Sequence, residues 1–174
     1  MGAIHQQAEY AAKKYKTRNP YELLDAIDAV TDFTYAFPAS GLKGFCTILN
    51  KIKYAVINGN LSDEDKRIVA GHEAAHLILH KHQILNSPAY ALKDFSIYDN
   101  SGRLELEANT FLANFLVSDD EILESMANPE GNFYFTAAEL FIPPPLLAIK
   151  VYSMVQRGHK IKIPENIDSK FLGK

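Results

Sequence analysis

The sequence has one cysteine, little net charge and no long apolar run, and each scarcity excludes a class of protein. Cys46 has no partner for an intramolecular disulfide, so a reducing compartment is expected. It lies in the apolar run 44–49, which indicates a core residue rather than a nucleophile. No segment has the roughly 20 apolar residues of a transmembrane helix, and residues 1–15 do not resemble a signal peptide. We therefore expect a cytoplasmic protein without membrane association.

The balance of charges argues against a nucleic-acid-binding protein. The formal net charge is −3, whereas binding to a phosphate backbone requires a basic surface. Apolar residues make up 47% of the chain and charged residues 22%, which is typical of a globular protein. The length of 174 residues suits one domain with a sizeable core, and we predict a single domain over residues 1–174.

The most informative stretch is a His-Glu-x-x-His pattern within the segment Gly71–His76. The surrounding residues predict a helix over 62–80. Ser62 is a good N-cap, and the three acidic residues that follow it suit the positive end of a helix. Apolar residues cover almost every side of this helix, as is typical of a buried helix.

The spacing of the pattern suits metal-dependent hydrolysis. His72 and His76 lie one turn apart on one helix face, so both imidazoles can reach one ion at about 2.0–2.1 Å. Glu73 is turned by roughly 100° from His72 and flanks the ion. Its carboxylate can take a proton from a water molecule whose pKa zinc has lowered to about 7. We expect one Zn²⁺, which suits this ligand set better than Mn²⁺.

The alternative is structural: three buried polar groups that find partners elsewhere in the core. We favour the metal interpretation because motif and helix agree. His80 shares the face of His76 but lies about 12 Å along the helix axis from His72. His80 and His82 are therefore predicted to be surface residues or neighbours of the ligands, not ligands themselves.

A catalytic zinc site usually has a third protein ligand. The strongly helical segment 103–117 supplies two carboxylates, Glu105 and Glu107. Glu107 lies nearer the apolar stripe of this helix, and a carboxylate turned towards the core needs a charge partner. We assign Glu107 as the third ligand, with Glu105 as the alternative. A solvated or salt-bridged pair of carboxylates is the structural interpretation.

The rest of the chain predicts an α+β fold, a mainly helical zincin-like domain with a small three-stranded antiparallel sheet. Its predicted elements are helices within 3–30 (3–16 and a second helix opened by Asn19-Pro20), a sheet within 31–58 (strands 33–37, 45–49 and 54–57), an irregular segment 83–102, a C-terminal helical hairpin 119–158 and a polar tail 159–174. In segment 83–102, Tyr90 and Tyr98 are candidate donors to an oxyanion or simply packed or exposed tyrosines. The hairpin could be a DNA-binding helix-turn-helix, but its second helix carries only Lys150 and Arg157, so we favour a packing hairpin or a docking surface.

Two segments together resemble a known family. Gly71–His80 (GHEAAHLILH), followed by Glu105–Ala113 (ELEANTFLA), is similar to the ImmA/IrrE family of bacterial and phage metallopeptidases. The resemblance extends over roughly residues 15–118. Ala75 stands where the family often has glycine. By position, the resemblance implies His72, His76 and Glu107 as zinc ligands and Glu73 as the base.

The resemblance also implies a function. Family members relieve repression by cleaving a helix-turn-helix repressor encoded beside them in a prophage or mobile element. We therefore expect a zinc-dependent endopeptidase with such a repressor as its substrate and protein partner. Two alternatives remain: a metal-binding regulator, or anti-repressor, that controls a partner without cutting it, and a DNA-binding regulator that uses the C-terminal hairpin.

Overall fold

The contacts within the chain define two compact units. A computed structural model describes residues 2–38, 40–86, 91–94, 102–128 and 132–161, with the backbone alone for 91–94. One unit, here called the helical unit, combines Met1–Lys16 with Tyr98–Lys174, and the other, the sheet unit, is Thr17–Ile97. Each is described by itself. Together they confirm the α+β class, while the prediction of a single domain over 1–174 stays a prediction.

The sheet unit contains a mixed sheet of four strands. In the order β1-β3-β2-β4 these are β1 (Ala29–Asp32), β3 (Ile52–Ile57), β2 (Gly44–Leu49) and β4 (Ala91–Asp94). Strand β2 pairs antiparallel with β3 and β4, whereas β1 runs parallel to β3. The predicted strands 45–49 and 54–57 are confirmed as β2 and β3, which form an antiparallel hairpin, but the prediction of three purely antiparallel strands is wrong. Asn50 and Lys51, both with positive φ, form the tight turn of the hairpin.

The predicted strand 33–37 is also wrong, because Asn58 and Gly59 take backbone hydrogen bonds of this segment. The buried Asn58 amide accepts a hydrogen bond from the Phe37 N–H and donates to the Phe37 carbonyl, both at 3.1 Å. Gly59 donates its N–H to the Tyr35 carbonyl at 2.8 Å. A Cβ at Gly59 would lie 2.4 Å from the Phe33 carbonyl oxygen, so only glycine permits this approach. These bonds replace a strand ladder.

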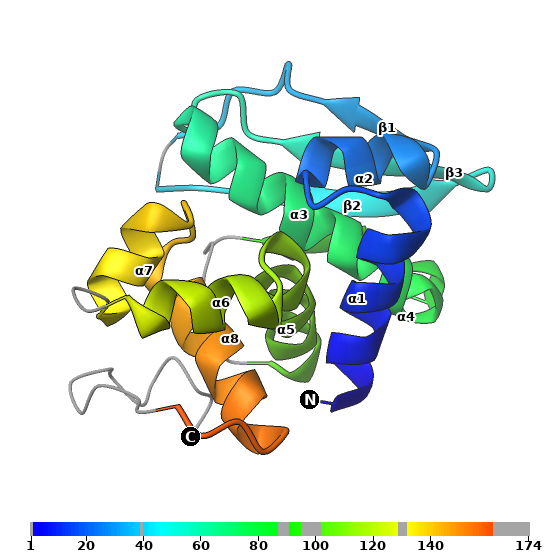
Figure 1. Cartoon of the computed structure of the whole chain (residues 1–174). Coiled ribbons are helices and arrows are strands. Elements are labelled where there is room, and N and C mark those ends of the chain that lie inside the picture. Colours follow the sequence, from blue (N-terminus) through cyan, green and yellow to red (C-terminus); the bar gives the residue numbers. More distant parts are fainter. Residues whose placement is uncertain (1, 39, 87–90, 95–101, 129–131, 162–174) are drawn as a thin grey trace. The chain divides into compact units, whose positions relative to one another are not determined.

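Helices cover the sheet and carry the motif. Helices α2 (Pro20–Ala26) and α3 (Asp63–Leu79) pack against each other and against the sheet, and α4 (Lys81–Asn86) follows (Figure 1). The caps are as predicted: the Asn19 side chain accepts from Tyr21 N–H, and the Ser62 hydroxyl accepts from Asp65 N–H. Helix α4 and strand β4 lie in or overlap the segment expected to be irregular. Tyr90 and Tyr98 lie outside the described residues.

The helical unit is built around α5 (Arg103–Leu116). Helices α1 (Gly2–Tyr15) and α8 (Pro144–Gln156) pack against α5, and α7 (Phe133–Glu139) packs against both α6 (Asp119–Ala127) and α8. Helix α6 begins with a capping box, in which the Ser118 hydroxyl accepts from Glu121 N–H while the Glu121 carboxylate accepts from Ser118 N–H. Every residue of α5 from Ala108 to Leu116 is buried. This helix is the centre of the core of the unit.

Lys150 and Arg157, the two basic residues considered for DNA binding, both form ion pairs inside the helical unit. Lys150 is fully buried, and its ammonium lies 2.8 Å from the Asp119 carboxylate. Arg157 donates two hydrogen bonds to the same carboxylate, at 2.5 and 2.9 Å. Base contacts in the major groove require exposed side chains. The observed ion pairs therefore favour the packing hairpin.

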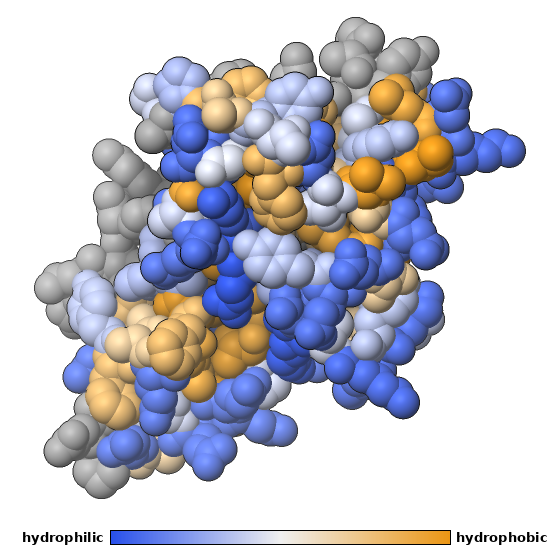
Figure 2. Space-filling model, turned by 90° about the horizontal axis from the view of Figure 1, so that it is seen from above, coloured by the Kyte–Doolittle hydropathy of each residue, from blue (hydrophilic) through white to orange (hydrophobic). Residues whose placement is uncertain are grey.

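Apolar side chains also remain at the surface. Figure 2 shows apolar patches among hydrophilic side chains on the face seen from above. Among the residues that the structure describes, the large exposed apolar ones are Tyr10, Val30, Phe33, Tyr35, Leu49, Ile52, Leu85, Leu123, Tyr134 and Phe141. In the part of the chain that the structure describes, no helix could cross a membrane alone. The pair α7 and α8, bent by 111°, meets the requirement only as a pair and only by length and composition.

Candidate metal centre

The two histidines of the motif meet on the buried side of α3. His72 is 4% exposed and His76 is 0% exposed. Their Nε2 atoms lie 3.0 Å apart, and the rings meet edge to face with centroids 4.6 Å apart. The helical spacing of four residues produces this approach, as the sequence predicted.

The distance between the two nitrogens fits a shared cation. Two imidazole lone pairs that face each other at 3.0 Å repel unless a proton or a cation lies between them. A zinc–nitrogen bond is about 2.0–2.1 Å long, so one ion can reach both Nε2 atoms. The donor set and its geometry therefore fit a zinc ion held by His72 and His76.

A third histidine, His80, contacts His76 at the other ring nitrogen. His80 is 1% exposed, and its Nδ1 lies 2.8 Å from Nδ1 of His76. His82, by contrast, is exposed. The prediction that neither is a ligand stays a prediction, but His80 is a buried neighbour of His76 and not a surface residue. Its position four residues after His76 is a signal that could have identified this contact from the sequence.

The motif glutamate is fully buried beside the first strand of the hairpin. Glu73 is 0% exposed. A Cβ added at Gly44, the first residue of β2, would lie 2.7 Å from Glu73 Oε1 and 2.6 Å from Val69 Cγ1. The absent side chain at Gly44 therefore leaves the space that this carboxylate uses. No local pattern could have revealed Gly44, because the contact joins residues far apart in the sequence.

The two candidate carboxylates of α5 have different surroundings within the helical unit. The Arg103 Nε donates to Glu107 at 2.7 Å, and the Glu107 side chain is 25% exposed. Glu105 is partly buried as well. Burial does not decide the prediction that Glu107 lies nearer the core, because both carboxylates are partly buried. The third ligand stays a prediction.

Glu105 and Glu107 lie on different faces of α5. Glu107 lies seven positions before Asn114 and so shares its face of the helix. Asn114 forms hydrogen bonds with His5 of α1 and Ser153 of α8. The face of Glu107 is therefore the one that packs inside the helical unit. Glu105 lies about half a turn away from it.

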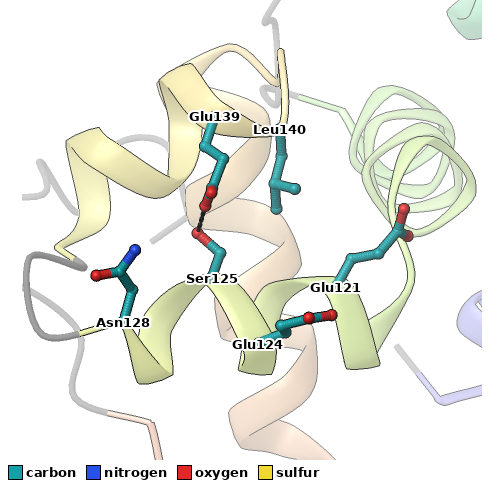
Figure 3. Close-up of a pocket in the computed structure, with 6 residues that line it drawn as sticks. All are labelled: Glu121, Glu124, Ser125, Asn128, Glu139 and Leu140. Atoms are coloured by element: carbon teal, nitrogen blue, oxygen red, sulfur yellow. Dashed lines mark hydrogen bonds between the residues drawn. The ribbon is translucent and has the colours of Figure 1, made fainter.

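A separate cavity within the helical unit is lined by acidic side chains. It has a volume of about 350 Å³ and lies between α6 and α7, with Glu121, Glu124 and Glu139 around it (Figure 3). Two of these carboxylates have structural roles. Glu121 belongs to the capping box of α6, and Glu139 accepts a hydrogen bond from Ser125 at 2.5 Å. We assign no chemistry to this cavity.

Comparison with known proteins places the motif within a family. A family model described as the IrrE N-terminal-like domain, of a peptidase family, matches residues 30–141, which is more than half of the chain. The chain is also 35% identical over 107 residues to a protein of Bacillus phage phi105 named uncharacterized immunity region protein 2. That match covers 62% of this chain and 63% of the phage protein, which is less than two thirds of the relative's length.

Proposed function

Because the chain belongs to the peptidase family of IrrE N-terminal-like domains, we propose that it is a zinc-dependent endopeptidase acting on a protein substrate. The observation that carries this proposal is the pair of buried Nε2 atoms 3.0 Å apart, on the helix that also carries the buried Glu73. In this proposal His72 and His76 hold the zinc ion. The cytoplasm is the proposed place of action.

Zinc, when bound, supplies Lewis-acid chemistry, because it lowers the pKa of water to about 7 and polarises a carbonyl group. The protein supplies the proton transfers. The Glu73 carboxylate accepts a proton from the water that attacks the scissile carbonyl carbon, and it then donates that proton to the departing amine nitrogen as the carbon–nitrogen bond breaks. Burial of Glu73 beside Gly44 keeps this carboxylate in one place during both transfers.

We propose a carboxylate of α5 as the third ligand. The sequence favours Glu107, but its pairing with Arg103 and its shared face with Asn114 support Glu105 instead. In this proposal the imidazoles of His72 and His76 and the carboxylate of Glu105 would make up the donor set of a catalytic zinc site.

The two carboxylates can be separated by measuring zinc affinity in the full chain. We expect Glu105→Gln to weaken zinc binding at least ten-fold in a chelator competition assay, because a neutral amide is a poor zinc ligand. Glu107→Gln, the matched control on the same helix, should bind zinc like the unaltered protein. The reverse result would assign the ligand to Glu107.

The substrate is proposed by analogy. A helix-turn-helix repressor fits the family resemblance, and the matched phage protein is named for an immunity region. The competing function is a metal-binding anti-repressor that controls the same repressor by contact alone. Both functions would require the metal site, so only cleavage of the repressor distinguishes them.

Glu73→Gln is the discriminating variant. We expect it to lower the rate of cleavage of the repressor encoded beside it by at least about 100-fold, because general acid–base catalysis contributes roughly 10²–10⁴-fold. Zinc content, measured by mass spectrometry of the purified protein, should stay at one ion per chain. Glu64→Gln, an exposed position in the first turn of the same helix, is the matched control. Unchanged control of the repressor by Glu73→Gln would favour the anti-repressor.

A further inference from the structure

We propose that His80 is a positioning residue that fixes the tautomer and ring orientation of His76. The inference rests on the proposed metal site, because it concerns which nitrogen of His76 is available as a ligand. It adds His80, the C-cap of α3, to the three site residues that this helix already carries. His80 would contact neither the metal nor the substrate.

The end of α3 holds His80 directly behind His76. His80 is the C-cap of the helix, and its backbone N–H donates to the His76 carbonyl at 2.8 Å. The two Nδ1 atoms are 2.8 Å apart, with ring centroids 4.9 Å apart and the ring planes tilted by 50°. Both side chains are buried, at 1% and 0% exposure, so neither ring is open to bulk water.

The chemistry of a neutral imidazole then determines the placement of the protons. A neutral ring carries one N–H and one lone pair, so two Nδ1 atoms at 2.8 Å must share a single hydrogen. If His76 gives its Nε2 lone pair to the ion that it shares with His72, its hydrogen must be on Nδ1. The Nδ1–H of His76 then donates to the Nδ1 lone pair of His80.

This arrangement is the one that metal-binding histidines generally require. A histidine ligand usually donates its other ring N–H to an acceptor, which fixes the ring orientation and raises the basicity of the ligand nitrogen. Carboxylates and carbonyls are the common acceptors, and an imidazole nitrogen can take the same role. Without His80, His76 would have to place its buried N–H elsewhere or adopt the tautomer that cannot bind the ion.

Three variants of the full chain test the proposal through zinc affinity. We expect His80→Leu, which removes the acceptor, to weaken zinc binding by about 10–100-fold in chelator competition. His80→Asn should restore most of the affinity, because the Asn Oδ1 can occupy the position of Nδ1 and accept the same hydrogen bond. His82→Ala, an exposed histidine two positions further on, should bind zinc like the unaltered protein.

A spectroscopic measurement separates positioning from packing. In the zinc-loaded protein, long-range nitrogen–proton correlation spectra should show His76 protonated at Nδ1. Unchanged zinc affinity in His80→Leu, or a zinc-loaded His76 protonated at Nε2, would overturn the role of His80 while the proposed metal site stands. Equal losses in the Leu and Asn variants would indicate packing alone and also overturn it. Failure of the unaltered protein to bind zinc would instead refute the proposed function.

Discussion

The space left at Gly44 shows how one missing side chain can set the position of Glu73, the proposed base. We expect Gly44→Ala to lower cleavage at least ten-fold while zinc affinity changes little. The added Cβ would lie 2.7 Å from Glu73 Oε1 and 3.0 Å from the Val56 carbonyl oxygen, and that backbone atom cannot swing away. The Glu73 carboxylate must therefore shift, and misplacement of a catalytic group by about 1 Å can cost 10²-fold in rate.

Steady-state kinetics and zinc titration of the same Gly44→Ala preparation check this prediction. A second variant that combines Gly44→Ala with Val69→Ala removes the 2.6 Å contact with Val69 and leaves the one with Glu73. It should remain impaired if the displaced carboxylate is the cause. Recovery in the double variant would trace the defect to the packing of Val69 instead.

Single residues were predictable where the chemistry depends on local spacing. His72 and His76 lie together because a helix brings every fourth residue to one face, and sequence alone gives that. The contact of His80 with His76 follows from the same spacing of four residues. Gly44 could not be foreseen, because its role depends on which strand α3 packs against.

Among the elements, helix starts were predicted well because capping is local. The side chains of Asn19, Ser62 and Ser118 all accept backbone hydrogen bonds at the first turn of a helix. The end of α2 was predicted less well. The helix stops at Ala26, and Asp28 with a φ of 57° turns the chain into β1, although apolar spacing extends to Val30.

The sheet was predicted less well because pairing is not a local property. Val30 and its neighbours form β1, four residues before the segment that the composition favoured. Segment 33–37 has strongly β-prone residues, but the Asn58 amide takes its backbone hydrogen bonds. The parallel pairing of β1 with β3 also depends on strand order, which alternation of residues does not encode.

At the scale of the whole molecule, the proposed ligands belong to separate compact units. The histidines lie in Thr17–Ile97, and Glu105 and Glu107 lie in Tyr98–Lys174. The family model spans both segments, because it covers residues 30–141. Two motifs predict the ligand types, but they do not show that the chain passes from one compact unit to the other between them.

The helical unit contains a partly buried charge network around Asp119. Its carboxylate meets Lys150 at 2.8 Å, Arg157 at 2.5 Å and His159 at 3.3 Å. Arg157 also donates to Nε2 of His5, at 3.1 Å. Burial alone would raise the pKa of Asp119, but hydrogen bonds from Arg157 and Lys150 hold that pKa well below its ordinary value. Burial lowers the pKa of Lys150.

This network predicts that removing Asp119 and removing Lys150 lower the free energy of unfolding by different amounts. Asp119→Ala should lower the free energy of unfolding by about 3–5 kcal/mol, because it leaves the fully buried Lys150 ammonium without its counter-charge. Lys150→Met, which keeps most of the side-chain volume, should cost much less, because Arg157 still pairs with Asp119. Urea unfolding at pH 7, followed by circular dichroism, compares the two variants. Equal losses would contradict this prediction.

The same network fixes the sign of the pH dependence. A carboxylate whose pKa is depressed by folding contributes its full stabilisation above the pKa of the unfolded chain, about 3.8, and loses it as the pH falls towards the folded value. The difference in unfolding free energy between the unaltered protein and Asp119→Ala should therefore still be present at pH 5, where this carboxylate is ionised in both the folded and the unfolded chain. Below about pH 3.8 it should shrink, since only the unaltered protein has this carboxylate to protonate. A difference that stays constant down to pH 2 would show that Asp119 acts by packing and not by charge.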